Sequence, residues 1–237
     1  MLSLLNKKWC LVEPSVETVS LLESGLQLPT AVAVLLANRG VTSIESAKDF
    51  IEADFARLHD PFLMTGMRKA VDRVIQALEH KEAITVFCDY DVDGVTSAAF
   101  LTHFFRDLDY PVEAYLPERQ TEGYGLNSDA VRKIREQGAG LMITADCGIT
   151  GVKEVALANE IGLDVIITDH HQVGEEGLPP AIAVLNPHRS DCEYPYRFLC
   201  GVGLAFKLAI AVRNTLHAAG WTKERLPNLK RHLDLFA

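Results

Sequence analysis

Acidic and imidazole side chains follow three short apolar runs of the sequence. They are Asp89, Asp91, Asp93, Asp146, Asp169, His170 and His171. Five carboxylates gathered in one place would repel one another strongly unless cations lay among them. Carboxylates together with a His favour Mn²⁺ or Mg²⁺, whereas a Zn²⁺ site more often uses Cys or several His. The ligands are too many for one ion, so we expect two, about 3.5 to 4 Å apart, an arrangement that drives in-line displacement at phosphorus.

Alternating strands and helices must bring these side chains together. Apolar runs predict strands over 83–88, 112–116, 141–144, 165–168 and 181–185, and intervening helical patterns predict helices over 95–108, 128–137, 152–160 and 203–219. This order indicates an α/β fold with a mostly parallel sheet and helices on both faces. Ligands of such sheets bind outside the carboxyl ends of the strands, where the three charged segments would meet.

The N-terminal part has a different pattern. Short helices are predicted over 29–38 and 42–52, the second from a capping box at Thr42–Glu45, and a longer one over 67–78. We therefore predict a helical N-terminal appendage over 1–80 and a catalytic core over 81–237. The stretch 226–237 begins a helix-like pattern and stops on apolar residues, so we expect that core to be truncated.

The amino-acid composition limits the class of protein and the compartment in which it works. Hydrophobic residues make up 48% of the 237 residues, enough for a large core, and the five Cys form no C-x-x-C pair, which suits a reducing compartment. There is no signal-peptide pattern and no run of about 20 apolar residues, so we expect a cytoplasmic protein without membrane contact. The formal net charge of −9 argues against an extensive binding surface for duplex DNA, although bound cations would offset part of this negative charge.

Each charged segment also has a structural interpretation. The Asp89–Gly94 stretch resembles a calcium loop, but its twelfth position is Phe100 instead of Glu. Asp146 before Gly148 is, taken alone, ordinary turn chemistry, and His170 and His171 could be a surface pair or a helix cap. The shared position at one sheet edge favours the metal-site interpretation.

Six ordered blocks resemble the DHH phosphoesterase superfamily, in particular its single-strand DNA exonucleases. The blocks are Cys88–Ser97 (CDYDVDGVTS), Thr121–Asn127 (TEGYGLN), Ile143–Ile149 (ITADCGI), Val165–His171 (VIITDHH), Leu185–His188 (LNPH) and Leu199–Ala205 (LCGVGLA). The order and spacing of these blocks resemble those of this superfamily from about residue 30 to the end of the sequence. The resemblance implies a 5′-to-3′ exonuclease of single-stranded DNA in repair and recombination, active with Mn²⁺ or Mg²⁺.

The resemblance also assigns roles at the metal site. Asp91, Asp93, Asp146 and His170 match metal ligands, with Asp146 as the bridge between two ions, and Asp89 lies in the same motif as a further candidate. Two further residues match family positions that do not bind metal. Asp169 matches a carboxylate that orients a neighbouring side chain, and His171 matches a group that faces the phosphate.

Four more residues are candidates for contacts to phosphate or DNA. They are Arg119, His188, Gly201 and Gly203. Arg119 could equally be an ordinary loop residue, and His188 a turn residue. The two glycines could offer backbone N–H groups to a phosphate or serve close packing at a helix start.

The resemblance has one departure and leaves the substrate open. A further ligand Asp of the family would lie beyond Ala237, so we expect these 237 residues alone to hold metal weakly and degrade DNA poorly. Expected partners are single-stranded DNA, a single-strand-binding protein and a helicase. The alternatives are a DHH phosphodiesterase of short oligonucleotides or cyclic dinucleotides, and a non-catalytic replication scaffold of the same superfamily.

Overall fold

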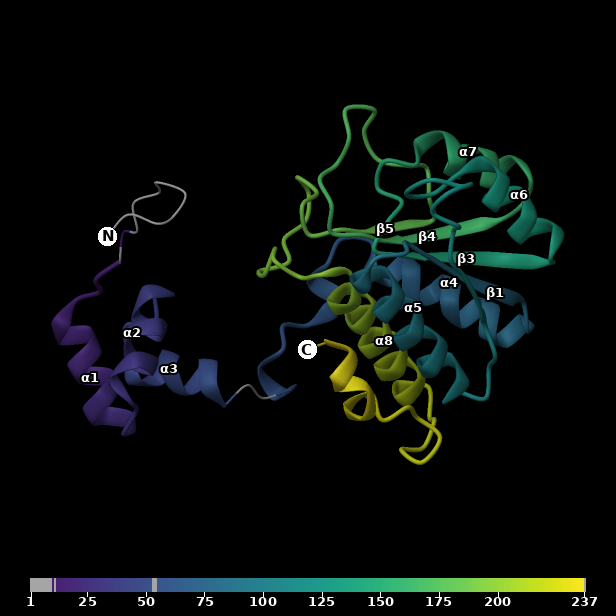
Figure 1. Cartoon of the computed structure of the whole chain (residues 1–237). Helices are drawn as coiled ribbons and strands as arrows, with labels where there is room; N and C mark the ends of the chain where they lie inside the picture. The colour runs from purple at the N-terminus through teal and green to yellow at the C-terminus, as the bar shows by residue number, and fades with distance from the viewer. Residues whose placement is uncertain (1–9, 11, 53–54, 237) are drawn as a thin grey trace. The chain divides into compact units, whose positions relative to one another are not determined.

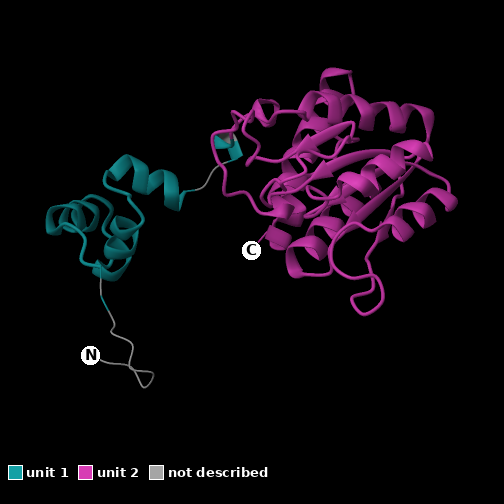
Figure 2. Ribbon diagram, turned by 90° about the horizontal axis from the view of Figure 1, so that it is seen from above, with its two compact units in different colours: residues 1–58 teal, residues 59–237 magenta. Residues whose placement is uncertain are grey.

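The computed structural model describes residues 10, 12–52 and 55–236. The chain divides into two compact units, Met1–Leu58 and His59–Ala237 (Figure 2). The division lies well before the boundary predicted at residue 80. The reason is helix α4 (Met67–His80), whose apolar face packs against strand β5 (Ala183–Leu185) and helix α8 (Gly201–Ala218) of the second unit.

The first unit is helical. Its helices are α1 (Val16–Leu26), α2 (Thr30–Asn38) and α3 (Ile44–Ile51), followed by the 3₁₀ turn η1 (Phe55–Arg57). Leu22, Ala33, Leu36 and Ala47 form most of its small core. The capping box at the start of α3 lies one residue later than predicted, because it is formed by Ser43 with Ser46 and not by Thr42 with Glu45. Helix α1 was not predicted.

The second unit is built on a five-stranded sheet in the order β2-β1-β3-β4-β5, with every neighbouring pair parallel. The remaining strands are β1 (Ala83–Cys88), β2 (Glu113–Tyr115), β3 (Ala139–Ala145) and β4 (Asp164–Thr168). The remaining helices are η2 (Pro61–Leu63), α5 (Val92–Arg106), α6 (Ser128–Glu136), α7 (Val152–Glu160) and η3 (Leu229–Phe236). The predicted fold class is confirmed.

Helices cover both faces of the sheet (Figure 1). Helices α6 and α7 lie on one face, where Val131, Ile134 and Val155 pack against apolar strand residues such as Met142 and Ile167. Helices α4, α5 and α8 lie on the other face, where α8 packs against both α4 and α5. Strands β1, β3, β4 and β5 are buried on both sides, which explains why the sequence shows continuous apolar runs there, whereas the edge strand β2 is largely exposed.

The strand order places a topological switch point between β1 and β3. The chain leaves β1 for β2 on one side, and β3, β4 and β5 then extend the sheet on the other side. The connections after β1 and β3 therefore run in opposite directions and open a crevice at the carboxyl ends of these two strands. Asp89 follows β1 and Asp146 follows β3, so the sequence puts carboxylates on both sides of that crevice.

Two helix starts differ from the prediction, whereas helix α6 begins at Ser128 as predicted. Helix α5 begins at Val92, capped by Asp91, so Asp93 and Gly94 lie in its first turn and not before it. Helix α6 is capped by Asn127, because that side chain accepts the Ala130 N–H at 2.8 Å. Helix α8 begins at Gly201, two residues earlier than expected.

Candidate metal centre

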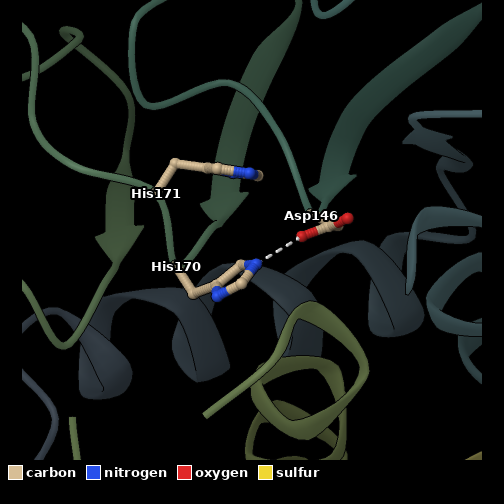
Figure 3. A group of neighbouring side chains, drawn as sticks. All are labelled: Asp146, His170 and His171. Atoms are coloured by element: carbon tan, nitrogen blue, oxygen red, sulfur yellow. Dashed lines mark ion pairs between the residues drawn. The ribbon is translucent and has the colours of Figure 1, made fainter. Parts of the chain in front are cut away.

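Three side chains from different parts of the chain converge at the carboxyl edge of the sheet. Asp146 follows β3, His170 follows β4, and Asp93 lies in the first turn of α5. The imidazole Nε2 of His170 lies 3.0 Å from Oδ1 of Asp146 and 3.6 Å from Oδ2 of Asp93. Figure 3 shows the His170 ring directed at Asp146, with His171 on the same segment. The sequence therefore brings two predicted carboxylate ligands and the predicted imidazole ligand to one point.

Asp146 is held in an unusual environment. It is 1% exposed and adopts a left-handed backbone conformation with φ of 64°. Its backbone N–H donates to the carbonyl of Thr168, and the Thr144 hydroxyl donates to the carbonyl of Cys147 at 2.7 Å. These bonds fix the turn after β3. Burial raises the pKa of the Asp146 carboxyl to about 6, although His170 acts in the opposite direction.

The start of helix α8 contacts the same point. The Gly201 and Val202 N–H groups donate to the two carboxylate oxygens of Asp93, at 2.6 and 2.8 Å. A Cβ atom at position 201 would lie 2.5 Å from Cβ of Asp146, so only Gly allows this approach. Gly201 was predicted to offer its N–H to a phosphate. In this structure Asp93 accepts that N–H, and the close approach to Asp146 supports the alternative of close packing, so the phosphate role stays a prediction.

Asp89 and Asp91 occupy different environments in the same motif. Asp89 is fully buried, its Oδ1 accepts the Tyr90 N–H at 2.7 Å, and burial raises its pKa. Asp91 is exposed, and its Oδ1 accepts the Gly94 N–H at 2.9 Å as the cap of α5. A Cβ atom on Gly94 would lie 2.4 Å from the Asp89 carbonyl oxygen, so this Gly lets α5 start directly against the end of β1. One Asp91 oxygen is thus committed to the helix.

Asp169 orients His171, not His170. Its Oδ1 lies 2.7 Å from Nδ1 of His171, and its Oδ2 accepts the Ile149 N–H at 2.8 Å. The His171 carbonyl accepts a hydrogen bond from the Asn186 amide, whose oxygen accepts the His188 N–H. With Nδ1 engaged by a carboxylate, Nε2 is the free nitrogen of His171. Among the described residues, the His188 side chain shows no contact of this kind to the site, so its predicted phosphate role stays a prediction.

Arg119 lies beside an aromatic pair. Its guanidinium carbon is 5.4 Å from the centre of the Tyr90 ring, which makes an edge contact with Tyr124 at 5.7 Å. The pKa of Tyr124 is raised by burial and by the carboxylates of Asp89 and Asp91. Arg119 therefore reaches the neighbourhood of the site through Tyr90. Sequence reasoning did not single out either tyrosine, although Tyr90 stands between two predicted ligands.

The donor set fits a hard divalent cation. Among the described residues, two buried carboxylate oxygens, Oδ2 of Asp89 and Oδ1 of Asp146, have no hydrogen-bond partner. Nε2 of His170 lies 3.0 Å from this Asp146 oxygen, so an imidazole and a buried carboxylate face the same point. Ligand atoms of Asp146, His170 and His171 all lie within 4.8 Å of one another. Buried carboxylate oxygens without partners are costly unless a cation binds them.

Fold and site together define an α/β protein with carboxylate and imidazole groups gathered at the switch point of its sheet. The model of the DHH family, N-terminal domain, matches residues 83–235. The chain belongs to the DHH family.

Curated relatives support a narrower placement. The chain is 44% identical over 209 residues to the single-stranded-DNA-specific exonuclease RecJ of Bacillus subtilis, covering 88% of this chain and 26% of the relative. It is 37% identical over 215 residues to RecJ of Escherichia coli, covering 89% of this chain and 36% of the relative. The chain thus spans about a quarter to a third of the length of these relatives.

Solved structures have the same fold. A RecJ from Thermus thermophilus in complex with Mn²⁺ matches with a TM-score of 0.71 and 27% identity, over 95% of this chain and 30% of that one. An exonuclease RecJ bound to manganese matches with a TM-score of 0.61 and 34% identity, over 73% of this chain and 41% of that one. Among the described residues of this chain, no helix has the length and apolar character needed to cross a membrane.

Proposed function

We propose that this chain is the N-terminal catalytic part of a divalent-metal-dependent exonuclease that hydrolyses single-stranded DNA from the 5′ end. The observation that carries the proposal is that Nε2 of His170 lies within 3.6 Å of a carboxylate oxygen of Asp93 and of one of Asp146. This arrangement occurs in a chain 44% identical to a single-stranded-DNA-specific exonuclease. Mn²⁺ or Mg²⁺ fits the donors, and manganese is bound in two similar solved structures; the number of carboxylate donors favours two ions per site.

The residues of the site have different roles in this proposal. Asp146 and His170 are the central ligands, Asp93 is a further ligand fixed by the start of α8, and Asp89 and Asp91 complete the set. Bound cations would acidify a water molecule and neutralise charge on the phosphate oxygens. The Asp169 carboxylate accepts a hydrogen bond from Nδ1–H of His171, and Nε2–H of the protonated ring would donate to a phosphate oxygen of the strand. Asp146 would bridge the two ions.

The test is hydrolysis of a single strand labelled at either end, by the natural full-length protein with Mn²⁺. We expect mononucleotides from the 5′ end, and a loss of at least about 10³-fold in rate for Asp146→Ala, in the range found for losing one strong electrostatic contact. Asp109→Ala, an exposed aspartate on the connection after α5, is the control. Near-normal turnover of Asp146→Ala would refute the bridging role.

Two alternatives remain distinguishable. A DHH phosphodiesterase of short oligonucleotides or cyclic dinucleotides would cleave dinucleotides faster than long strands. A non-catalytic replication scaffold would show no hydrolysis, and calorimetry would detect no heat of Mn²⁺ binding that is lost in a variant without Asp146. The convergence of Asp93, Asp146 and His170 favours catalysis over the scaffold. Single-strand-binding protein and helicase as partners, and a cytoplasmic location, stay predictions from the sequence.

A further inference from the structure

Two exposed aromatic side chains stand directly before the helix that contacts the metal centre. Phe198 is 82% exposed and Tyr196 is 49% exposed, and their rings make an edge contact with centroids 5.8 Å apart. Exposure of so much aromatic surface is unfavourable in water unless a ligand uses it. Within the described part of the chain, neither the Tyr196 hydroxyl nor the Arg197 guanidinium between them has a hydrogen-bond or ion-pair partner.

The segment is held firmly at both ends. On one side Tyr194 is 3% exposed, makes an edge contact with His59 and lies 5.5 Å from the ammonium group of Lys207. On the other side Gly201 begins helix α8, and its N–H donates to Asp93. The exposed residues are therefore presented from a fixed loop.

The position of this loop links it to the reaction site. Phe198 is three residues from Gly201, which approaches Asp146 so closely that a Cβ atom would not fit. A polymer whose phosphate reaches the metal centre would pass within a few nucleotides of the two rings. An aromatic pair with an unpaired cation suits the unstacked bases and the phosphates of a single strand, because stacking on aromatic rings tolerates any base.

We propose that Tyr196, Arg197 and Phe198 form a stacking platform that holds a single nucleic-acid strand next to the metal centre. The proposal rests on the proposed function and adds residues that position the strand without taking part in the chemistry. The rings stack on bases, and Arg197 contacts a neighbouring phosphate. Because each stacked base contributes about 1–3 kcal/mol, loss of both rings should weaken strand binding roughly tenfold or more.

The direct test places a fluorescent reporter at the platform of the full-length natural protein. In Phe198→Trp the indole keeps an aromatic ring and should be quenched when a 12-nucleotide oligo(dT) binds in Ca²⁺, with strand integrity checked on a gel. An abasic oligomer of the same charge should quench it little. Phe50→Trp, which replaces a Phe that is 56% exposed in the first unit, is the matched control, and signal from the two natural Trp is subtracted.

Binding and turnover give the second test. Tyr196→Ala with Phe198→Ala should raise the Kd for oligo(dT) about tenfold or more without changing its salt dependence. Arg197→Ala should lower the slope of log K against log salt by about 1. The aromatic exchange Tyr196→Phe with Phe198→Tyr should bind normally. Hydrolysis of a dinucleotide with Mn²⁺, which is too short to reach the platform, should keep its wild-type kcat in all these variants.

Several outcomes would overturn the platform. One is an indole at 198 that another part of the protein shields from iodide before DNA is added. Another is equal quenching of the Phe50→Trp control. A third is normal oligo(dT) binding by the double Ala variant in a protein that degrades single strands, a result that leaves the proposed function intact. Absence of any Mn²⁺-dependent hydrolysis by the wild type would instead overturn the proposed function.

Discussion

Replacement of Asp146 by Asn should make the metal-free protein more stable while abolishing its response to metal. The buried carboxyl has a pKa of about 6 instead of 3.8. Each pKa unit corresponds to about 1.4 kcal/mol, so ionisation of Asp146 costs the folded state about 3 kcal/mol. Asn removes the charge and keeps the shape, and it tolerates the left-handed backbone at this position.

The sign follows from proton binding. The folded-state pKa lies above the unfolded value, so between about pH 4 and 6 the folded state binds more protons and its stability falls as the pH rises. The free energy of unfolding of Asp146→Asn minus that of the wild type should be near zero at pH 4. It should reach about 3 kcal/mol above pH 7 in EDTA. Mn²⁺ should raise the Tm of the wild type and leave that of Asp146→Asn unchanged.

Urea denaturation from pH 4 to 8 measures this difference. Asp109→Asn is the matched control, because Asp109 is exposed and also has a positive φ, of 57°, so the gain from Asn in a left-handed conformation is the same. A variant at 146 that is less stable than the wild type at pH 8 in EDTA, or a difference that does not change with pH, would show that the buried carboxylate carries no such cost.

Three further substitutions separate packing, orientation and stability. Gly201→Ala puts a methyl group 2.5 Å from Cβ of Asp146, so we expect a loss of about 1–3 kcal/mol in stability and weaker Mn²⁺ binding by calorimetry. Asp169→Asn weakens the hold on His171, and steady-state kinetics should show kcat reduced about 10- to 100-fold, a loss that Asp169→Glu partly restores. The Arg73 guanidinium is 8% exposed and forms ion pairs with Glu82 and Asp164, which Arg73→Met removes. Because both carboxylates keep some solvent contact, urea denaturation should show a loss of about 2 kcal/mol in the free energy of unfolding. The Mn²⁺ affinity should be unchanged.

The sequence predicted the sheet edge well for a physical reason. Parallel strands buried on both faces must be continuously apolar, so the points where Asp89, Asp146 and Asp169 end these runs are visible without a structure. The parallel arrangement then places those points at one edge. The convergence of Asp146 with His170 followed from the same argument.

The division of roles within the Asp89–Gly94 motif could not be predicted. Whether a carboxylate caps a helix or faces a crevice depends on where the helix starts, and Asp91 and Asp93 are both suitable caps by residue type. The structure starts α5 at Val92, which commits one oxygen of Asp91 to the Gly94 N–H. The contact between Gly201 and Asp93 joins residues 108 positions apart, and no local pattern encodes it.

The N-terminal unit was predicted least completely. Helix α1 contains Ser20, Ser24 and Gly25, residues with weak helix propensity, so its apolar spacing did not stand out. It is stabilised by packing of Leu22 in the small core with α2 and α3, a tertiary effect. The domain boundary was placed too late because α4 is a strong helix by sequence, and only its contacts assign it to the second unit.

Anomalous diffraction from a crystal of this protein grown with Mn²⁺ tests the central claim most directly. Data collected at the manganese edge should show a peak within about 2.0–2.4 Å of a carboxylate oxygen of Asp146 and of a ring nitrogen of His170, with Asp93 alongside. Two results would contradict a metal centre formed by these three side chains. One is the absence of a peak at the carboxyl ends of β3 and β4 in a crystal soaked in saturating Mn²⁺. The other is a peak whose ligands are all other residues.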